Sequence, residues 1–142
     1  MSFRTVPHQS PQYKQAVALR REVLRLPLGL DFTKEELDQE ADSFHCIWEE
    51  QGEVLATLIL KPLSDTKLKM RQVAVRPQQQ ASGYGSKLLQ AAHQWAKAQG
   101  YDYVEAHVRQ VAFSFYQKLN YQAVGDTFLE VGIPHVKMYR SL

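Results

Sequence analysis

The sequence predicts an α/β (α+β) fold built on a mixed, mainly antiparallel central sheet of six to seven strands, with helices on both faces. An early helical pattern is followed by segments in which apolar residues alternate, joined by short turns, as in antiparallel strands. A strand–helix–strand–helix–strand run comes later, and this order favours a mixed sheet. We find no internal repeat, low-complexity segment or Gly/Ser linker, so residues 1–142 are expected to form one domain.

The N-terminal third is predicted to hold one short strand and two helices. Residues 2–7, "SFRTVP", form the strand. Ser10 offers an N-cap with Pro11 at the first helical position, and "LPLGLDF" ends that helix. Thr33 and Glu36 make a capping box for a short acidic helix, "TKEELDQEAD". Apolar residues of the first helix keep helical spacing, and its basic residues are expected to point mostly elsewhere, namely Lys14, Arg20, Arg21 and Arg25.

From Phe44 the hydrophobic period changes to two, which is typical of strands. The segments "FHCIWEE" and "VLATLILKPL" flank Gln51 and Gly52 and form a predicted hairpin. A third strand, "KLKMRQVAVRP", ends at Pro77. Its alternation is expected to place one set of side chains on a common face, namely Met70, Gln72 and Ala74.

A long amphipathic helix is predicted from about Gly83 to Gln99, with Gly100 as its C-cap residue. The remaining elements are shorter. "YDYVEAHV" is a strand, "VAFSFYQKLN" a short helix and "YQAVGD" another strand. A "GIP" turn then leads into the last strand, "HVKMYRSL".

The composition excludes several classes of function. A formal net charge of +2 is too small to indicate nucleic acid or a membrane surface as a partner. No apolar run approaches the ~20 residues of a membrane-spanning helix, and the N-terminus lacks the apolar segment of a signal peptide. The lone Cys46 excludes an intrachain disulfide and fits a reducing compartment. We therefore expect a cytoplasmic protein, and a homodimer is compatible with the sequence.

The stretch "QQQASGYGSKLL" places two glycines at the start of the long helix. The first N–H groups of a helix lack partners within it, and with the helix dipole they form an anion site. Gly83 and Gly85 allow a ligand to approach the backbone because neither has a Cβ. The stretch is neither a Walker motif nor a Rossmann fingerprint, and it suits two adjacent phosphates held by main-chain amides. The alternative is a glycine-rich helix start that serves only the turn.

The longer stretch "VAVRPQQQASGYGSKLL" resembles the coenzyme A pyrophosphate loop of the GNAT superfamily of N-acetyltransferases. That pattern is a Val-x-Val strand, then Gln/Arg-x-x-Gly-x-Gly/Ala, then an amphipathic helix. Gln80, Gly83 and Gly85 occupy its diagnostic places, and the intervening and following positions are Ala81, Ser82, Tyr84 and Ser86. The resemblance implies a GNAT-like fold, acetyl-CoA as co-substrate and an amine acceptor, either a small molecule or a peptide. It also implies that the main chain of Val73 and Val75 pairs with the pantetheine amides as an added strand would.

Two further segments extend the resemblance. "FYQKLNY" is similar to the family's Phe-Tyr-x-Lys-x-Gly-Phe segment, with Asn120 in place of glycine. "FLEVGIPHVKM" is similar to a subgroup of small bacterial acetyltransferases with Gly-Ile-Pro-His near the C-terminus. One position departs from the pattern, because Arg109 stands where many members carry Asn or Gln. The usual side-chain contact to the pantetheine arm is therefore not carried over.

The resemblance implies direct attack of an amine on the thioester, with Tyr116 as the acid that protonates the departing sulfur. Tyr116 shares an inward helical face with Leu119, and a phenol of pKa ~10 can serve a thiolate of pKa ~8.5. A core tyrosine is the alternative for this residue. Glu130 and His135 flank the "VGIP" turn and are candidates for the base or for substrate binding, with His45 a weaker option.

Other functions stay open at the level of the sequence. A non-catalytic acyl-CoA-binding or sensor module would keep the glycine loop while Tyr116 only packs. A nucleic-acid-binding module lacks the necessary basic patch with interleaved aromatic residues. The five histidines and one cysteine show no metal-ligand spacing, so no metal site is expected, and Cys46 is expected in the core.

Overall fold

The computed structural model describes residues 3–142, apart from the side chain of Ala81. One sheet holds seven strands in the order β1-β2-β3-β4-β5-β7-β6, and β4 and β5 pair in parallel while the other neighbours are antiparallel. This confirms the predicted fold class. Ser2 of the predicted first strand lies outside the described residues. The strands are β1 (Phe3–Val6), β2 (Phe44–Glu50), β3 (Glu53–Pro62), β4 (Lys67–Val75), β5 (Tyr103–Arg109), β6 (Gln122–Glu130) and β7 (Ile133–Ser141).

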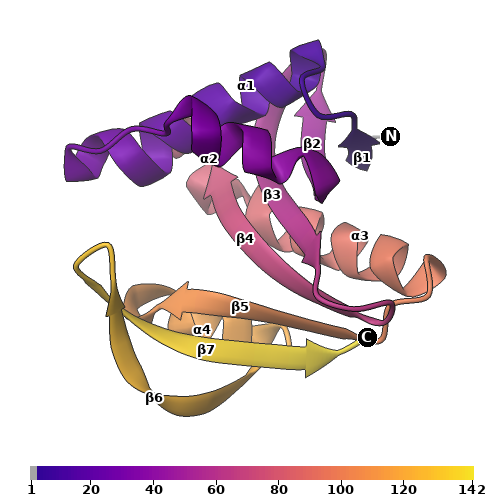
Figure 1. Ribbon diagram of the computed structural model, residues 1–142, viewed down its shortest axis with the longest axis vertical. Coiled ribbons are helices and arrows are strands. Elements are labelled where there is room, and N and C mark those ends of the chain that lie inside the picture. Colours follow the sequence, from indigo (N-terminus) through magenta and orange to yellow (C-terminus); the bar gives the residue numbers. More distant parts are fainter. Residues whose placement is uncertain (1–2) are drawn as a thin grey trace.

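Helices cover both faces of this sheet (Figure 1). On one face lie α1 (Pro11–Arg20) and α2 (Lys34–Asp38), and on the other lie α3 (Tyr84–Ala98) and α4 (Phe113–Lys118). No helix within residues 3–142 is long and apolar enough to cross a membrane. Shorter helical turns connect these elements, namely η1 (Arg21–Arg25), η2 (Leu26–Leu28), η3 (Gln39–Asp42), η4 (Pro77–Ser82) and η5 (Gln110–Ala112).

The predicted helix caps are present. The Ser10 hydroxyl accepts a hydrogen bond from the Tyr13 N–H at 3.2 Å, and Pro11 is the first residue of α1. Thr33 and Glu36 exchange the reciprocal bonds of a capping box at the start of α2, each at 3.1 Å. Gly100 follows α3 with φ +98°, a conformation that glycine adopts at little cost. These local signals were sufficient to place both helix starts.

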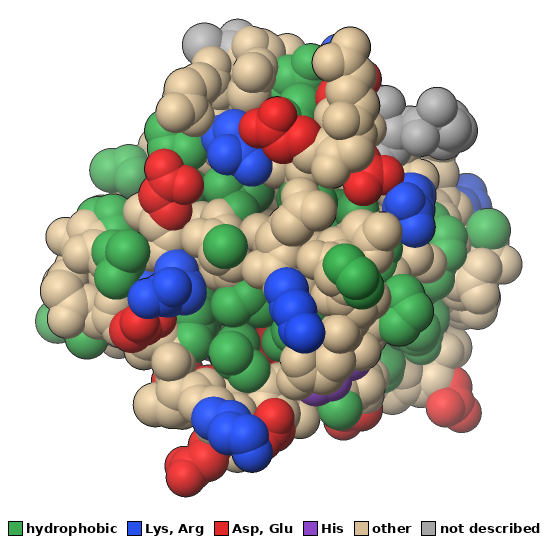
Figure 2. All heavy atoms as spheres, turned by 90° about the horizontal axis from the view of Figure 1, so that it is seen from above, with side chains coloured by type: hydrophobic (Ala, Val, Ile, Leu, Met, Phe, Trp, Pro, Cys, Tyr) green, Lys and Arg blue, Asp and Glu red, His purple; other side chains and the backbone are tan. Residues whose placement is uncertain are grey.

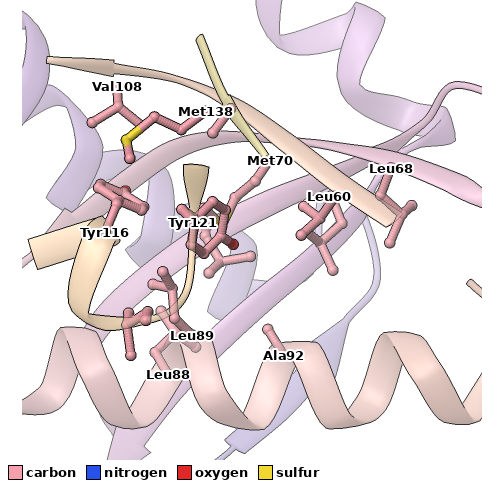
Figure 3. Close-up of a cluster of buried hydrophobic side chains, with 14 of the residues drawn as sticks. Leu60, Leu68, Met70, Leu88, Leu89, Ala92, Val108, Tyr116, Tyr121 and Met138 are labelled. Carbon is pink, nitrogen blue, oxygen red and sulfur yellow. The ribbon is translucent and has the colours of Figure 1, made fainter. Parts of the chain in front are cut away.

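Two apolar cores lie on opposite faces of the sheet. The larger one packs α3 and α4 against the central strands, and Figure 3 shows Leu88 and Leu89 of α3 beneath Met70 and Leu60. The smaller core packs α1 against the other face through residues such as Tyr13. Strands β2, β3 and β4 therefore contribute buried residues to both cores.

Strand β4 departs from the alternation that the sequence predicts. Its pairing with β3 shifts register between Thr57 and Ile59, and Gln72 has a φ of +57°. This β-bulge inserts one extra residue, so Met70 belongs to the α3 core while Ala74 belongs to the α1 core. The prediction that Met70, Gln72 and Ala74 share a face is therefore wrong.

Arg20 corrects a second expectation, because it is buried rather than directed away from the core. Its Nη2 lies 2.6 Å from Glu40 Oε2 and its Nη1 lies 2.9 Å from Oε1. The Tyr13 hydroxyl donates to the same carboxylate at 2.9 Å. The partner comes from η3, twenty residues further along the chain, so helical spacing within α1 could not reveal it.

The C-terminal turn starts one residue earlier and ends two residues earlier than the predicted "GIP" turn. Strand β6 continues to Glu130, Ile133 already pairs with it, and Val131 and Gly132 form the turn. Both turn residues are left-handed, with φ of +47° and +74°. Left-handed φ at both central residues is the geometry of a two-residue hairpin turn, which matches the twist of the strands.

Candidate active site

A deep cleft opens where β4 and β5 separate. The two strands pair only over Lys67–Met70 and Tyr103–Ala106, and beyond this point they diverge (Figure 1). The resulting cleft has a volume of about 670 Å³. Its walls come from η1, β4, the start of α3, β5, α4 and the β6–β7 turn. The Gln72 bulge lies at the point of divergence and helps to open it.

The edge of β4 beyond the bulge is free of β5. Arg76 N–H donates to Leu55 O of β3 at 2.8 Å, so alternation directs the main chain of Val73 and Val75 toward the opposite edge. Within residues 3–142, the Val75 carbonyl accepts a bond from Gln80 Nε2 at 3.2 Å, which confirms this direction. Both valines line the cleft. The arrangement leaves room for an extended ligand beside β4.

The glycine stretch enters the cleft from the start of α3. Pro77–Ser82 is wound into the helical turn η4 rather than an open loop, and Gly83 follows with φ +78°. Gly83 O accepts from Lys87 N–H, and no side chain caps the helix, so its first N–H groups lack partners within α3. Gln80, Gly83, Gly85 and Ser86 all line the cleft. The anion site that the sequence predicts at the start of α3 therefore opens into the cleft.

The lack of a side chain at Gly85 has a packing reason as well. A Cβ there would lie 3.3 Å from Val75 Cγ2 and 3.5 Å from Phe115 Cζ. Gly85 is buried where α3, β4 and α4 meet, so a larger residue would push these elements apart. At Gly83 a Cβ would meet nothing within 4 Å, and only its left-handed backbone favours glycine.

Three predicted loop residues are placed differently. The Tyr84 ring packs beside Trp48, with centroids 6.4 Å apart, and Lys87 Nζ lies 5.0 Å from it. Ser82 is exposed, and neither Ser82 nor Tyr84 lines the cleft with its side chain. The side chain of Ala81 lies outside the described part of the chain.

Tyr116 lies in the wall of the cleft and at the edge of the larger core (Figure 3). Its ring makes edge-to-face contacts with Phe115 and Tyr121, at centroid distances of 5.2 and 5.3 Å. Burial raises the pKa of Tyr116 above its ordinary value, so the hydroxyl keeps its proton at neutral pH. Leu119 is buried as predicted, whereas Phe115 is partly exposed and lines the cleft.

Glu130 and His135 meet at the β6–β7 end of the cleft, together with a residue that the sequence reading did not select, His107. Glu130 Oε1 lies 2.8 Å from His107 Nδ1, and Oε2 lies 3.6 Å from His135 Nε2. His135 Nδ1 lies 2.7 Å from Ile133 O. Since a carbonyl only accepts hydrogen bonds, His135 carries a proton on Nδ1.

The electrostatics of this cluster keep Glu130 ionised. Partial burial pushes the pKa of Glu130 upward, but the hydrogen bond from His107 and the charges of His107, His135 and Lys69 outweigh it. The net result is a pKa below the ordinary value. In the ring form that carries its proton on Nδ1, His107 donates that proton to the carboxylate, and Nε2 is an acceptor nitrogen.

His107 could have been found from strand alternation. Val104, Ala106 and Val108 of β5 face the larger core, so His107 and Arg109 face the other side, toward η1. Nothing in the sequence alone places His107 beside Glu130, because β7 lies between their strands in the sheet.

Two other candidates lie outside the cleft. His45 is buried, its Nε2 is 2.9 Å from Glu40 O, and burial lowers its pKa. Cys46 is fully buried in the larger core, where burial raises the pKa of its thiol to about 12. His45 is thus not placed to act as the base, and Cys46 is a core residue. Residues 3–142 contain no group of His, Cys, Asp and Glu side chains arranged to hold a metal ion.

A sequence model of the acetyltransferase (GNAT) family matches residues 13–121. This span contains most of α1, all of β4, the glycine stretch and Tyr116, whereas Glu130 and His135 lie beyond it.

Three individual proteins are similar to this chain over most of its length. The uncharacterized protein YyaT of Bacillus subtilis (strain 168) is 26% identical over 132 residues, which cover 85% of this chain and 88% of that protein. A presumed N-acetyltransferase from Lactobacillus plantarum superposes with a TM-score of 0.84 at 26% identity, covering 100% of this chain and 99% of that one. A GNAT family acetyltransferase from Elizabethkingia anophelis, solved with acetyl-CoA bound, superposes with a TM-score of 0.77 at 17% identity, with coverage of 99% and 97%. At this last identity the likeness shows the fold alone.

Proposed function

Because the chain belongs to the acetyltransferase (GNAT) family, we propose that it moves an acetyl group from acetyl-CoA to an amine by direct attack. The observation that carries this proposal is a single cleft that joins the start of α3, the open edge of β4, Tyr116 and Glu130. The bound acetyl-CoA of the Elizabethkingia anophelis protein supports acyl-CoA as the co-substrate. Family membership supports acyl transfer in general, and the nature of the acceptor belongs to the proposal.

Coenzyme A is proposed to lie along β4 and to end at α3. Its pyrophosphate accepts hydrogen bonds from the backbone N–H groups that follow Gly83, where the helix dipole also favours negative charge. Its pantetheine arm pairs with the main chain of Val73 and Val75, as an added strand pairs with a sheet edge. The Gln80 side chain must then leave the Val75 carbonyl. The remaining proposed contacts are main-chain or side-chain groups of Ala81, Ser82, Tyr84, Gly85 and Ser86.

The proposed reaction forms one bond and breaks one. The amine nitrogen attacks the thioester carbonyl carbon, the C–S bond breaks, and the electron pair leaves with sulfur. Tyr116 supplies the proton that converts the thiolate to free coenzyme A, since burial keeps its hydroxyl protonated, and the proton that the attacking nitrogen loses on becoming an amide restores the phenol. The dry site that raises the pKa of the phenol also raises the pKa of the thiol, which keeps the two groups matched.

The amine must lose a proton, because an alkylammonium has a pKa of ~10.4. Glu130 is a weak base on its own, as its pKa lies below the ordinary value, but its charge attracts a cationic amine. We assign the proton acceptor to the Glu130–His107 pair, in which Glu130 orients the ring and His107 Nε2 accepts. His135 is proposed to border Glu130 on its buried side, with Nε2 at 3.6 Å from Oε2. This replaces the simpler assignment of Glu130 or His135 alone.

Several finer statements are also proposals. We propose that residues 1–142 act as one N-acetyltransferase domain and that the chain belongs with the small bacterial acetyltransferases that carry Gly-Ile-Pro-His near the C-terminus. A cytoplasmic location is proposed because the free thiol of Cys46 fits a reducing compartment. The homodimer stays a prediction.

The proposed function is tested by incubating the protein with acetyl-CoA and a panel of primary amines. Released thiol is measured together with the mass of the acetylated amine. We expect thiol release that depends on an amine and an amine product that is heavier by one acetyl group. If acetyl-CoA binds in calorimetry but is not consumed in the presence of any of the amines, the protein is instead a non-catalytic acyl-CoA-binding module.

A further inference from the structure

The side of the cleft opposite α3 is lined by basic side chains from distant parts of the chain. Met70 faces the larger core, so its neighbour Arg71 projects to the other face of the sheet. Arg109 projects the same way from β5, because Val108 faces the core. Arg25 of η1 reaches the same cleft from above this face. We call Arg25, Arg71 and Arg109 the arginine cluster.

The positive charge of this cluster is not neutralised by ion pairs within residues 3–142. No carboxylate of the described residues lies within 4 Å of a guanidinium nitrogen of Arg25, Arg71 or Arg109. Burial lowers the pKa of Arg25, and the charges of Arg20, Arg109 and Arg71 lower it further against the opposing effect of Glu36. The arginines are therefore close enough to repel one another.

Two acidic residues of the neighbouring strands already have basic partners. Glu130 accepts from His107 at 2.8 Å, and Glu105 lies 3.5 Å from Lys137 Nζ. Lys69 also lines the cleft and adds to the basic character of this side. An excess of arginine over carboxylate in a partly enclosed cleft favours an anionic group, and guanidinium groups bind carboxylate and phosphate by paired hydrogen bonds.

The phosphates of coenzyme A do not account for the arginine cluster. The amides that follow Gly83 start α3, on the face of the sheet that carries the larger core. The arginine cluster lies on the opposite face, where η1 and the β6–β7 turn border the cleft. In a GNAT-type reaction this is the side left for the acceptor once β4 binds the pantetheine arm.

Resting on the proposed function, we propose that the acceptor is a small amine that also carries a carboxylate or a phosphate. The anionic group binds the arginine cluster, and the amine lies toward Glu130 and His107. This deepens the interpretation of Arg109, which faces the acceptor rather than the pantetheine arm. The acidic segment "TKEELDQEAD" does not contribute to this site, since none of its residues lines the cleft.

The test compares amines in pairs that differ only by the anionic group. Glucosamine 6-phosphate is compared with glucosamine, and free amino acids are compared with their amides, so that phosphate and carboxylate acceptors are distinguished. We expect a preference of about 10- to 100-fold in kcat/KM for the anionic member of at least one pair, as one charge-assisted hydrogen-bonded contact provides. Arg71→Gln and Arg109→Gln should remove most of this preference and leave the KM for acetyl-CoA unchanged. Lys97→Gln, an exposed change on α3, is the matched control.

Equal or better turnover of the neutral members, or a preference that survives in both arginine variants, would overturn the proposal. If no amine is acetylated, the proposed function fails and the arginine cluster is judged by binding alone. The protein is then saturated with coenzyme A, which fills the phosphate site, and titrated with inorganic phosphate and with glutamate in a calorimeter. If a probe binds and Arg71→Gln weakens that binding at least 10-fold, the result supports an anion site. If neither phosphate nor glutamate binds, the anion site is refuted.

Discussion

The hydroxyl of Tyr116 is the single group on which the proposed chemistry depends most. Tyr116→Phe removes that hydroxyl and little packing, so turnover should fall by ~10²–10⁴-fold while acetyl-CoA affinity stays nearly unchanged. Steady-state kinetics and calorimetry measure the two quantities. Tyr121→Phe is the control, because Tyr121 is a buried neighbour whose hydroxyl lies 2.6 Å from His93 and does not line the cleft. Equal loss of turnover in both variants would mean that Tyr116 only packs.

The two glycines at the start of α3 should respond differently to substitution. Gly85→Val places branched carbon against Val75 and Phe115, so we expect a loss of about 1–3 kcal/mol in unfolding free energy and weaker acetyl-CoA binding. Gly83→Ala meets open space and should cost ~1–2 kcal/mol for its left-handed backbone alone. Urea denaturation and calorimetry check both. Unchanged acetyl-CoA affinity in a folded Gly85→Val variant contradicts the assignment of this helix start to phosphate binding.

At the scale of elements, the buried Arg20–Glu40 pair joins α1 to η3. Arg20→Met leaves the Glu40 carboxylate buried with only the Tyr13 hydroxyl, and we expect a loss of about 3–5 kcal/mol. Adding Glu40→Gln keeps an acceptor for Tyr13 and removes the unpaired charge, so the double variant should recover most of that loss. Urea denaturation at neutral pH measures the three proteins.

The exposed pair Arg4–Glu49 is the comparison for this prediction. Arg4 is 47% exposed, so Arg4→Gln should change the unfolding free energy by less than about 1 kcal/mol. A double variant at Arg20 and Glu40 that is as unstable as Arg20→Met alone would show that packing, and not the unpaired charge, causes the loss.

Elements set by local signals were predictable, and elements set by pairing were not. The capping residues of α1 and α2 and the Gln51–Gly52 turn act within a few residues, so the sequence shows them directly. The bulge at Gln72 depends on how β4 pairs with β3, and no local sequence feature of β4 predicts it. That bulge lies where β4 and β5 diverge, and it helps to open the cleft.

The same distinction holds for the candidate site. The glycine stretch and Tyr116 have local sequence patterns, and the structure brings them to one cleft with Glu130 and His135. His107 and the arginine cluster have no local pattern, because their elements meet only across the sheet. The sequence therefore predicted more of the residues on the proposed cofactor side of the cleft than of those on the acceptor side.

At the scale of the whole molecule, charge is dispersed over the surface while ionisable groups in the interior are neutral or paired. On the face in Figure 2, basic and acidic side chains of the described residues are interspersed with hydrophobic ones. Inside, Arg20 is paired with Glu40, whereas His93 and His45 are buried near their partners' hydroxyl and carbonyl groups. Protonation of these buried histidines is therefore expected to destabilise the fold in acid.

His93 allows this dependence to be tested. Burial, aided by the charge of Arg140, lowers the pKa of His93 from 6.5 to about 4. The unfolded chain therefore binds one more proton than the folded chain between pH 6.5 and 4, and stability falls as the pH falls through that window.

His93→Gln keeps a side chain that can bond to the Tyr121 hydroxyl but does not titrate. Between pH 7 and 5, wild type should lose about 2 kcal/mol more unfolding free energy than His93→Gln. The pKa of His45 is also lowered, but His45 contributes the same loss of unfolding free energy to both proteins, so its effect cancels in the difference. Urea denaturation at the two pH values gives the difference, and parallel losses in the two proteins would show that His93 is already protonated in the fold.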